Sequence, residues 1–373
     1  MPTGMLVMKW DERMGVNILA TYPEETEIQE RTLMQVYSQH EFTGEAGLVV
    51  LSAGAIHLAS YYTGPETSVY VILLLTAEED GDAYEEGLVE ISRQILTTLD
   101  PEPLKKMLPS LFQRLSIYPT LNQEQRLAML YNSTVKRMIM ERLRSECLLP
   151  KSEITIWLKD QYQEGFVDLD SIMSSLVKNG LVKISSVQGI SSDIVFFNRD
   201  LMVMRVPPAE LIKDPAGRHL PESLASDYKT EVRNFFLNYE VSKEDNVKVI
   251  DEVLLDPAAY ECIRLMREAI VTRNELEKLR KKGVDNVDRV LKILWENKMI
   301  SVFKDEKDTE YYALQSDFKI LKIYPKYNVD TIRAQYRTRT KNPNSLVRAL
   351  DLMKSEYYAM LDEQKSAGKA EDA

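Results

Sequence analysis

The residues of this chain that could support catalysis or bind a metal are few and scattered. Its three histidines, His40, His57 and His219, fall in an expected helix, an expected strand and a linker, without the short spacing of zinc ligands. Its two cysteines, Cys147 and Cys262, form no CxxC pair, which argues against both a zinc site and a disulfide framework. We therefore expect structural roles for all five residues, with the cysteines buried.

Motifs that bind phosphate or activate a nucleophile are also missing. The chain contains no GxxxxGK[ST] or GxGxxG loop and no GxSxG turn. An acidic group lacks EF-hand spacing and suits a solvated loop and a helix start: Glu78, Glu79, Asp80 and Asp82. We predict no catalytic residue, no metal and no cofactor; an active site assembled from distant residues is the alternative.

Two basic clusters are candidates for contacts with phosphate or with a partner. The first closes an expected helix just before Gly283: Lys278, Arg280, Lys281 and Lys282. Cations and a capping glycine are ordinary at a helix C-terminus, so we favour that local role. The second cluster is the better functional candidate because its first two members share a helical face, although a solvated face explains it more simply: Arg333, Arg337, Arg339 and Lys341.

Three aromatic residues are candidates for exposed partner contacts: Trp10, Tyr61 and Tyr62. Tyr61 and Tyr62 are adjacent in one expected strand, so their side chains point to opposite faces of a sheet. One of them leaves the core unless helices cover both faces. Packing in the core is the alternative that we favour.

The length and composition of the chain indicate the class of protein and the number of domains. A chain of 373 residues that is 44% hydrophobic and 28% charged is typical of a soluble protein of two or three domains. No apolar run is long enough to span a bilayer and no signal-peptide pattern opens the chain, which favours a cytoplasmic protein. The first 120 residues contain 7 Lys and Arg against 18 Asp and Glu, so they hold all of the net charge of −11. An acidic solvated face is favoured there over a surface for a basic partner.

Alternation and helical periodicity in the first 118 residues predict the order β-β-α-β-β-β-α-α. The first helix is expected at residues 24–42, and the last at 104–117 with Pro109 kinking or dividing it. This order and the opening WDERMGVNILATYP resemble the longin domains of the longin and roadblock (profilin-like) group. The resemblance implies a five-stranded antiparallel sheet with helices on its faces, and a non-enzymatic platform for small GTPases, SNARE-type helices or other such domains.

The rest of the chain contains an internal repeat. Three blocks match in order: LRSECLLPKSEI with LMREAIVTRNEL, DLDSIMSSLVKNGLVKI with NVDRVLKILWENKMISV, and RDLMVMRVPP with SDFKILKIYP. Each copy reads as three helices followed by a β-hairpin, which resembles the winged-helix fold. We predict that the repeated strand closes the core of its own copy and that Pro208 and Pro325 end its ladder.

The predicted fold class is α+β. The predicted segments are a longin-like domain (1–120), a first winged helix (121–210), a linker and connecting helix (211–258), a second winged helix (259–327), a C-terminal helix broken near residues 342–343 (328–364) and a disordered tail (365–373).

Winged helices that read DNA present cations on the third helix and the wing. In the first copy the third helix is expected to expose mostly acidic and hydroxyl side chains: Asp168, Asp170, Ser171, Ser174, Ser175 and Lys178. In the second copy Arg289 and Lys292 are offset by nearby carboxylates, and the wing KDEKDTE is net negative. Duplex DNA is therefore disfavoured as a partner.

These patterns together favour a non-enzymatic adaptor or scaffold. Tandem winged helices without basic recognition surfaces resemble subunits of the ESCRT-II complex, where the fold serves protein contact. With the longin resemblance, this implies a small GTPase or a trafficking assembly as partner. The alternative is a winged-helix transcription regulator that binds duplex DNA. The sequence does not specify an oligomeric state.

Overall fold

The computed structural model describes residues 2–371 except residues 12, 14, 27, 45, 54–55 and 163–168. Two compact units make up the chain: Met1–Leu121 with Thr155–Ser175, and Asn122–Ile154 with Leu176–Ala373. Among the described residues, no helix is long and apolar enough to cross a membrane. Asp168 and the last two residues of the predicted tail, Asp372 and Ala373, lie outside the described part.

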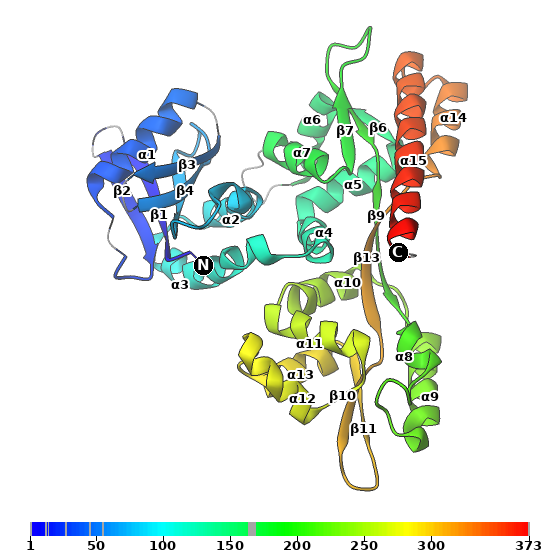
Figure 1. Cartoon of the computed structure of the whole chain (residues 1–373). Helices are drawn as coiled ribbons and strands as arrows, with labels where there is room; N and C mark the ends of the chain where they lie inside the picture. Colours follow the sequence, from blue (N-terminus) through cyan, green and yellow to red (C-terminus); the bar gives the residue numbers. More distant parts are fainter. Residues whose placement is uncertain are drawn as a thin grey trace. The chain divides into compact units, whose positions relative to one another are not determined.

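An antiparallel sheet of five strands, in the order β2-β1-β5-β4-β3, forms the centre of the first unit (Figure 1). Its strands are β1 (Gly4–Asp11), β2 (Gly15–Tyr22), β3 (Gly47–Ala53), β4 (Ile56–Tyr62) and β5 (Val69–Leu75). Its helices are α1 (Glu30–Thr43), the short η1 (Gly81–Tyr84), α2 (Glu85–Leu96), α3 (Pro101–Ser116) and the short η2 (Tyr118–Thr120). The predicted order of elements and the five-stranded antiparallel sheet are confirmed.

Helices pack on both faces of this sheet. Leu33 and Val36 of α1 lie in one core cluster with Leu6 and Met8 of β1. Helix α2 contacts the sheet at β4, and α3 contacts it at β1 and β2. The central strands β1 and β5 are buried along most of their length, which explains their continuous apolar sequences.

Two helix boundaries differ from the prediction. Helix α1 begins at Glu30, because the acidic residues Glu24 and Glu25 lie in a turn in which the Thr26 N–H donates to the Pro23 carbonyl. Helix α3 runs through Pro109 without dividing. A stripe of buried leucines packs along it and outweighs the local cost of the proline: Leu104, Leu108, Leu111 and Leu115.

The repeat predicted from the sequence is present as a repeated order of elements. The first copy contains α5 (Thr134–Glu146), β6 (Leu148–Pro150), α6 (Lys151–Gln161), α7 (Leu169–Lys178), β7 (Val182–Ser185) and β8 (Ile194–Phe197). The second contains α11 (Pro257–Glu268), β10 (Val271–Thr272), α12 (Arg273–Glu277), the short η4 (Lys278–Lys282), α13 (Val287–Glu296), β11 (Ile300–Lys304) and β12 (Glu310–Leu314). Their three-stranded sheets have equivalent orders, β6-β8-β7 and β10-β12-β11.

The repeated strands pair with each other rather than within their own copies. Strand β9 (Asp200–Val206) and strand β13 (Asp317–Ile323) form a separate antiparallel ribbon, which Figure 1 shows between the two copies. Val203 lies opposite Ile320, its equivalent in the repeat, so the ribbon has a local two-fold relation. The prediction that each strand closes its own copy is therefore wrong. Alternation specifies the two faces of a strand but leaves its partner open.

The second unit also contains helices that belong to neither copy. They are α4 (Gln123–Asn132), α8 (Ala209–Lys213), α9 (Glu222–Asn238), α10 (Lys243–Val249), the π-helical turn η3 (Ile250–Leu254), α14 (Asn328–Thr338) and α15 (Pro343–Glu371). The predicted break near residues 342–343 is present between α14 and α15. Helix α15 continues to Glu371, so most of the tail predicted to be disordered is helical, in keeping with its alanine, lysine and glutamate content.

Candidate functional site

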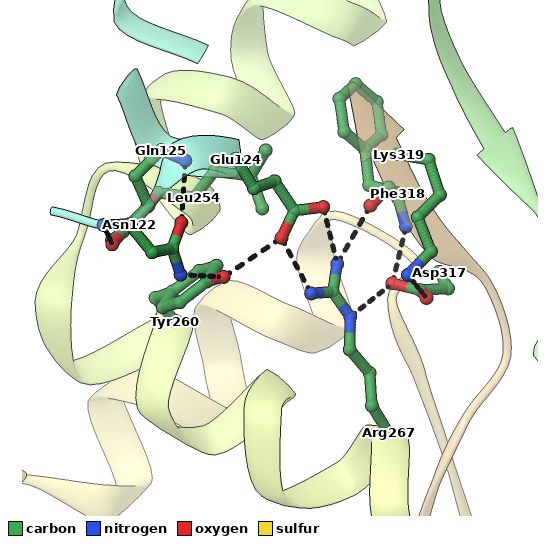
Figure 2. Close-up of polar contacts among 9 residues, drawn as sticks. All are labelled: Asn122, Glu124, Gln125, Leu254, Tyr260, Arg267, Asp317, Phe318 and Lys319. Atoms are coloured by element: carbon green, nitrogen blue, oxygen red, sulfur yellow. Dashed lines mark hydrogen bonds and ion pairs between the residues drawn. The ribbon is translucent and has the colours of Figure 1, made fainter. Parts of the chain in front are cut away.

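A polar cluster in the second unit surrounds Arg267, in the last turn of α11 (Figure 2). Its guanidinium donates to both carboxylate oxygens of Glu124, at 2.7 and 3.1 Å, and to Asp317 Oδ1 at 2.8 Å. A further bond of 2.9 Å reaches the carbonyl of Phe318. One side chain thus joins the first turn of α4, the end of α11 and the start of β13.

A second layer of hydrogen bonds holds Glu124 in place. The hydroxyl of Tyr260 donates to Glu124 at 2.9 Å, and the amide of Asn122 donates to that hydroxyl at 2.5 Å. Asn122 and Gln125 form a capping box at the start of α4, and Gln125 also donates to the Leu254 carbonyl. Figure 2 shows these side chains converging from α4, η3 and α11.

Two groups of this cluster have pKa values shifted in the direction that favours a charged arginine and a neutral tyrosine. Burial opposes the charge on Arg267, but the bonds to Glu124 and the charge of Asp317 raise its pKa above the usual range. Burial, together with the neighbouring Glu124, raises the pKa of Tyr260. Charge pairs with this many hydrogen bonds are typical of structural networks.

The first copy has a matching network at the start of β9. Arg144 donates to both carboxylate oxygens of Asp200 at 2.8 Å, and the Tyr327 hydroxyl donates to the same carboxylate at 2.8 Å. Asp200 and Asp317 each also accept the N–H of the next residue. The sequence repeat indicated both aspartates but missed their arginines, because the aligned helices place Arg267 opposite Ser145 instead of Arg144.

A third network surrounds Arg205, which lies near the C-terminal end of β9. This arginine is 7% exposed and donates to both oxygens of Asp245 and to the hydroxyl of Ser316. Its guanidinium lies over the rings of Phe235 and Tyr239. Burial opposes the charge of Asp245, but the bonds from Arg205 and Tyr239 hold its pKa below the ordinary value. All three networks include a residue of β9 or β13 and stabilise the ribbon.

Two of the three histidines make side-chain contacts within the first unit. His40 contacts the Ser60 hydroxyl at 3.0 Å, while His57 lies between the Ser52 hydroxyl and the Glu79 carbonyl, each at 2.7 Å. Both cysteines are free and buried, and burial raises the pKa of each thiol to about 12. Within the described residues, no group of three or more His, Cys, Asp or Glu is arranged to hold a metal.

The acidic residues near Glu78 have local structural roles. Glu79 accepts from the backbone and hydroxyl of Thr76 and from Tyr84, and Asp80 caps η1 by accepting the N–H of Asp82. This agrees with the expected loop and helix start.

The basic cluster at the end of α12 lies on the surface of the second copy. Arg280 pairs with Glu277 at 2.9 Å, and Lys278 and Lys281 are exposed, while the side chain of Lys282 lies outside the described part. Gly283 adopts φ +89° and caps η4, which confirms its predicted role.

The second basic cluster does not form one patch. Arg333 and Arg337 are exposed one turn apart on α14, with Arg333 3.4 Å from Asp330. Arg339 ends the helix with φ +56°. Lys341 instead pairs with Glu146 at 2.8 Å and ties the link between α14 and α15 to the end of α5. Of the predicted set of four, Arg333, Arg337 and Arg339 are thus exposed and Lys341 is held in an ion pair.

The three aromatic candidates are packed rather than exposed. Tyr61 and Tyr62 are both buried, on opposite faces of a sheet that has helices on both sides. Trp10 is half-buried and stacks on Tyr37, with ring centroids 3.7 Å apart. Packing in the core, which the sequence analysis favoured over exposure, is therefore confirmed for Tyr61 and Tyr62. The expected exposure of Ser175 is wrong, because this residue is buried in α7; the side chain of Ser171 lies outside the described part.

Trp295, which the sequence analysis did not single out, has a side chain that is 64% exposed near the end of α13. The two cations on this helix lie beside carboxylates: Arg289 is 2.8 Å from Asp256, and Lys292 is 3.8 Å from Glu296. The surface of α13 therefore combines a large exposed aromatic ring with locally paired charges. Periodicity could have indicated this position, because Trp295 lies one residue beyond the buried stripe that ends at Leu294.

No known family model, curated protein or solved structure matches this chain.

Proposed function

We propose that this protein is a non-enzymatic adaptor that binds protein partners through a longin-like domain and two winged helices. The strand order β2-β1-β5-β4-β3, with helices on both faces, supports the longin resemblance. The repeated order of helices and three-stranded sheets supports the winged-helix resemblance. A small GTPase or an ESCRT-like subunit is the class of partner that these resemblances imply.

The main observation that supports this proposal is the surface of α13. A third helix that reads DNA needs cations free to meet phosphate, but Arg289 and Lys292 each lie beside a carboxylate. Exposed tryptophan is costly to leave in water and is enriched at the centres of protein interfaces. Trp295 therefore favours a protein surface as the ligand of this helix.

The wing of the second copy supports the same choice of partner. Lys304 lies 3.3 Å from Asp308 and 3.1 Å from Glu310, and Asp305 accepts backbone N–H groups within the loop. Hydrogen bonds from Thr309 and Lys307 outweigh desolvation and lower the pKa of Asp305, so the loop stays negatively charged near neutral pH. A negatively charged wing would repel phosphate.

The first test is binding of the full chain to labelled duplex DNA over a salt series. We expect no binding at low salt. Tight binding that falls steeply with salt, and that is lost on reversal of Arg289 and Lys292, would replace the adaptor with the transcription regulator.

The second test compares affinity capture by the wild-type chain and by the variants Trp295→Ala and Leu237→Ala. Leu237 is 70% exposed on α9 and serves as a matched control. A partner that uses α13 should be lost with Trp295→Ala only, and its direct binding should weaken at least about tenfold when both proteins are purified. Equal binding to all three chains would remove α13 from the proposal.

A further inference from the structure

Helix α15 has one face that packs into the second unit. Leu346, Ala349 and Met353 lie in a buried cluster with Ile332 of α14. Glu356, on the same side, accepts from Arg199 and from Lys183. These contacts fix the rotation of α15 about its own axis.

A second apolar stripe follows the exposed side of α15. Val347, Leu350, Tyr357 and Tyr358 are between 42% and 55% exposed. They recur at helical spacing: Val347 and Tyr358 lie in line on the outer side, whereas Leu350 and Tyr357 lie between them and the buried face, where the Tyr357 ring is 5.6 Å from that of Tyr324. An amphipathic helix with a single solvated side has no need of such a strip, which is typical of a contact surface.

Two opposite charges lie in the middle of this strip. Asp351 and Lys354 are exposed, and neither has an ion-pair partner among the described residues. On the helix they fall between Val347 on one side and Tyr358 on the other. The strip thus carries an apolar end, an anion, a cation and a second apolar end.

From this arrangement we infer that α15 pairs antiparallel with α15 of a second copy of the chain. With a two-fold axis between residues 352 and 353, Asp351 of each copy meets Lys354 of the other, and Val347 meets Tyr358. A parallel pair would place each charge beside its own equivalent, which is unfavourable. The strip is therefore complementary to itself only in the antiparallel direction, as an isologous interface requires.

The size of the strip sets the expected strength of the dimer. Four large side chains over about three turns cover less than the standard interface of about 800 Å² per partner. We therefore expect a dimer that dissociates on dilution, with a dissociation constant on the order of micromolar.

Sedimentation of the full chain over a concentration series tests the pairing. The wild-type chain should change from monomer to dimer, and Leu350→Glu should weaken the dimer at least about tenfold. Asp351→Lys should also weaken it, whereas the double variant Asp351→Lys, Lys354→Asp should restore it to within about threefold, because the reciprocal pairs are re-formed with inverted signs. All three positions are exposed, so unchanged circular dichroism serves as the folding control.

The register is tested with a short bis-maleimide crosslinker. An equal mixture of the Val347→Cys and Tyr358→Cys chains should yield crosslinked dimer, and each variant alone should yield much less. The native thiols Cys147 and Cys262 are buried and provide a low background. A monomer at all concentrations overturns the inference. So does a dimer that withstands Leu350→Glu, or that crosslinks best as Val347→Cys alone.

Discussion

His40, in the last turn of α1, is buried, with its Nε2 3.0 Å from the Ser60 hydroxyl and its ring near Tyr62 and Tyr70. Burial lowers the pKa of His40 to about 4, although the hydrogen bond with Ser60 acts in the opposite direction. The unfolded chain takes up a proton near pH 6.5, while the folded chain does not until about pH 4. The free energy of unfolding of the first unit should therefore fall as pH drops through this range.

We expect this effect to reach about 3 kcal/mol between pH 7 and pH 4. The variant His40→Gln keeps an amide that can bond to Ser60 but does not titrate in this range. Urea unfolding at a series of pH values should show a smaller loss for the variant than for the wild-type chain. Equal pH dependence in the two proteins would assign the loss to other groups.

Arg267 is the residue on which the Figure 2 network depends, because it reaches Glu124, Asp317 and the Phe318 carbonyl at once. Lysine keeps the charge but cannot span these three acceptors. We expect Arg267→Lys to lower the free energy of unfolding by about 2–4 kcal/mol. Arg264→Lys, on an exposed pair with Glu261 in the same helix, should change it by less than about 0.5 kcal/mol. Similar losses in chemical denaturation would contradict a special role for Arg267.

At the level of elements, β13 shows how far alternation alone can predict burial. Phe318 and Ile320 are buried, whereas Leu321 is exposed, as the period of a strand requires. Phe318→Ala should therefore cost about 3–5 kcal/mol of stability, and Leu321→Ala about 1 kcal/mol or less. Hydrogen exchange at the amides of β9 and β13 should rise in the first variant only. Equal costs would mean that the two faces are packed alike.

The alternation of apolar residues in β13 does not determine which strand β13 pairs with. The sequence showed that the same strand occurs twice, with an aspartate first and a proline after its end. Pairing within a copy and pairing between copies bury the same alternating residues, so periodicity could not choose between them. The choice depends on contacts such as Arg144 with Asp200 and Arg205 with Asp245, which join residues far apart in sequence.

At the level of the whole molecule, the first and second units each have their own sheets and their own buried clusters. Proteins built this way commonly unfold in more than one step. We expect calorimetry to resolve two transitions. At pH 5, His40→Gln should shift one of them, and Phe318→Ala should shift the other. One cooperative transition that both variants shift would show that the units unfold together.

The sequence by itself determined the local elements. Apolar alternation and turn residues specified the five strands of the first unit, and three matched blocks specified the repeat. The expected burial of Cys147 and Cys262 is also confirmed. Each of these conclusions depends on residues close together in the chain, where spacing and geometry are directly related.

Only the tertiary structure decided which elements meet. It joined β9 to β13, placed Arg267 between Glu124 and Asp317, buried Tyr61 and Tyr62, and left Trp295 exposed. It also showed that α15 has a second apolar strip beyond the one that the core uses. The physical reason is the same in each case. Contacts between distant residues are selected by the packing of whole elements, and a local period carries no information about the surface that an element finally meets.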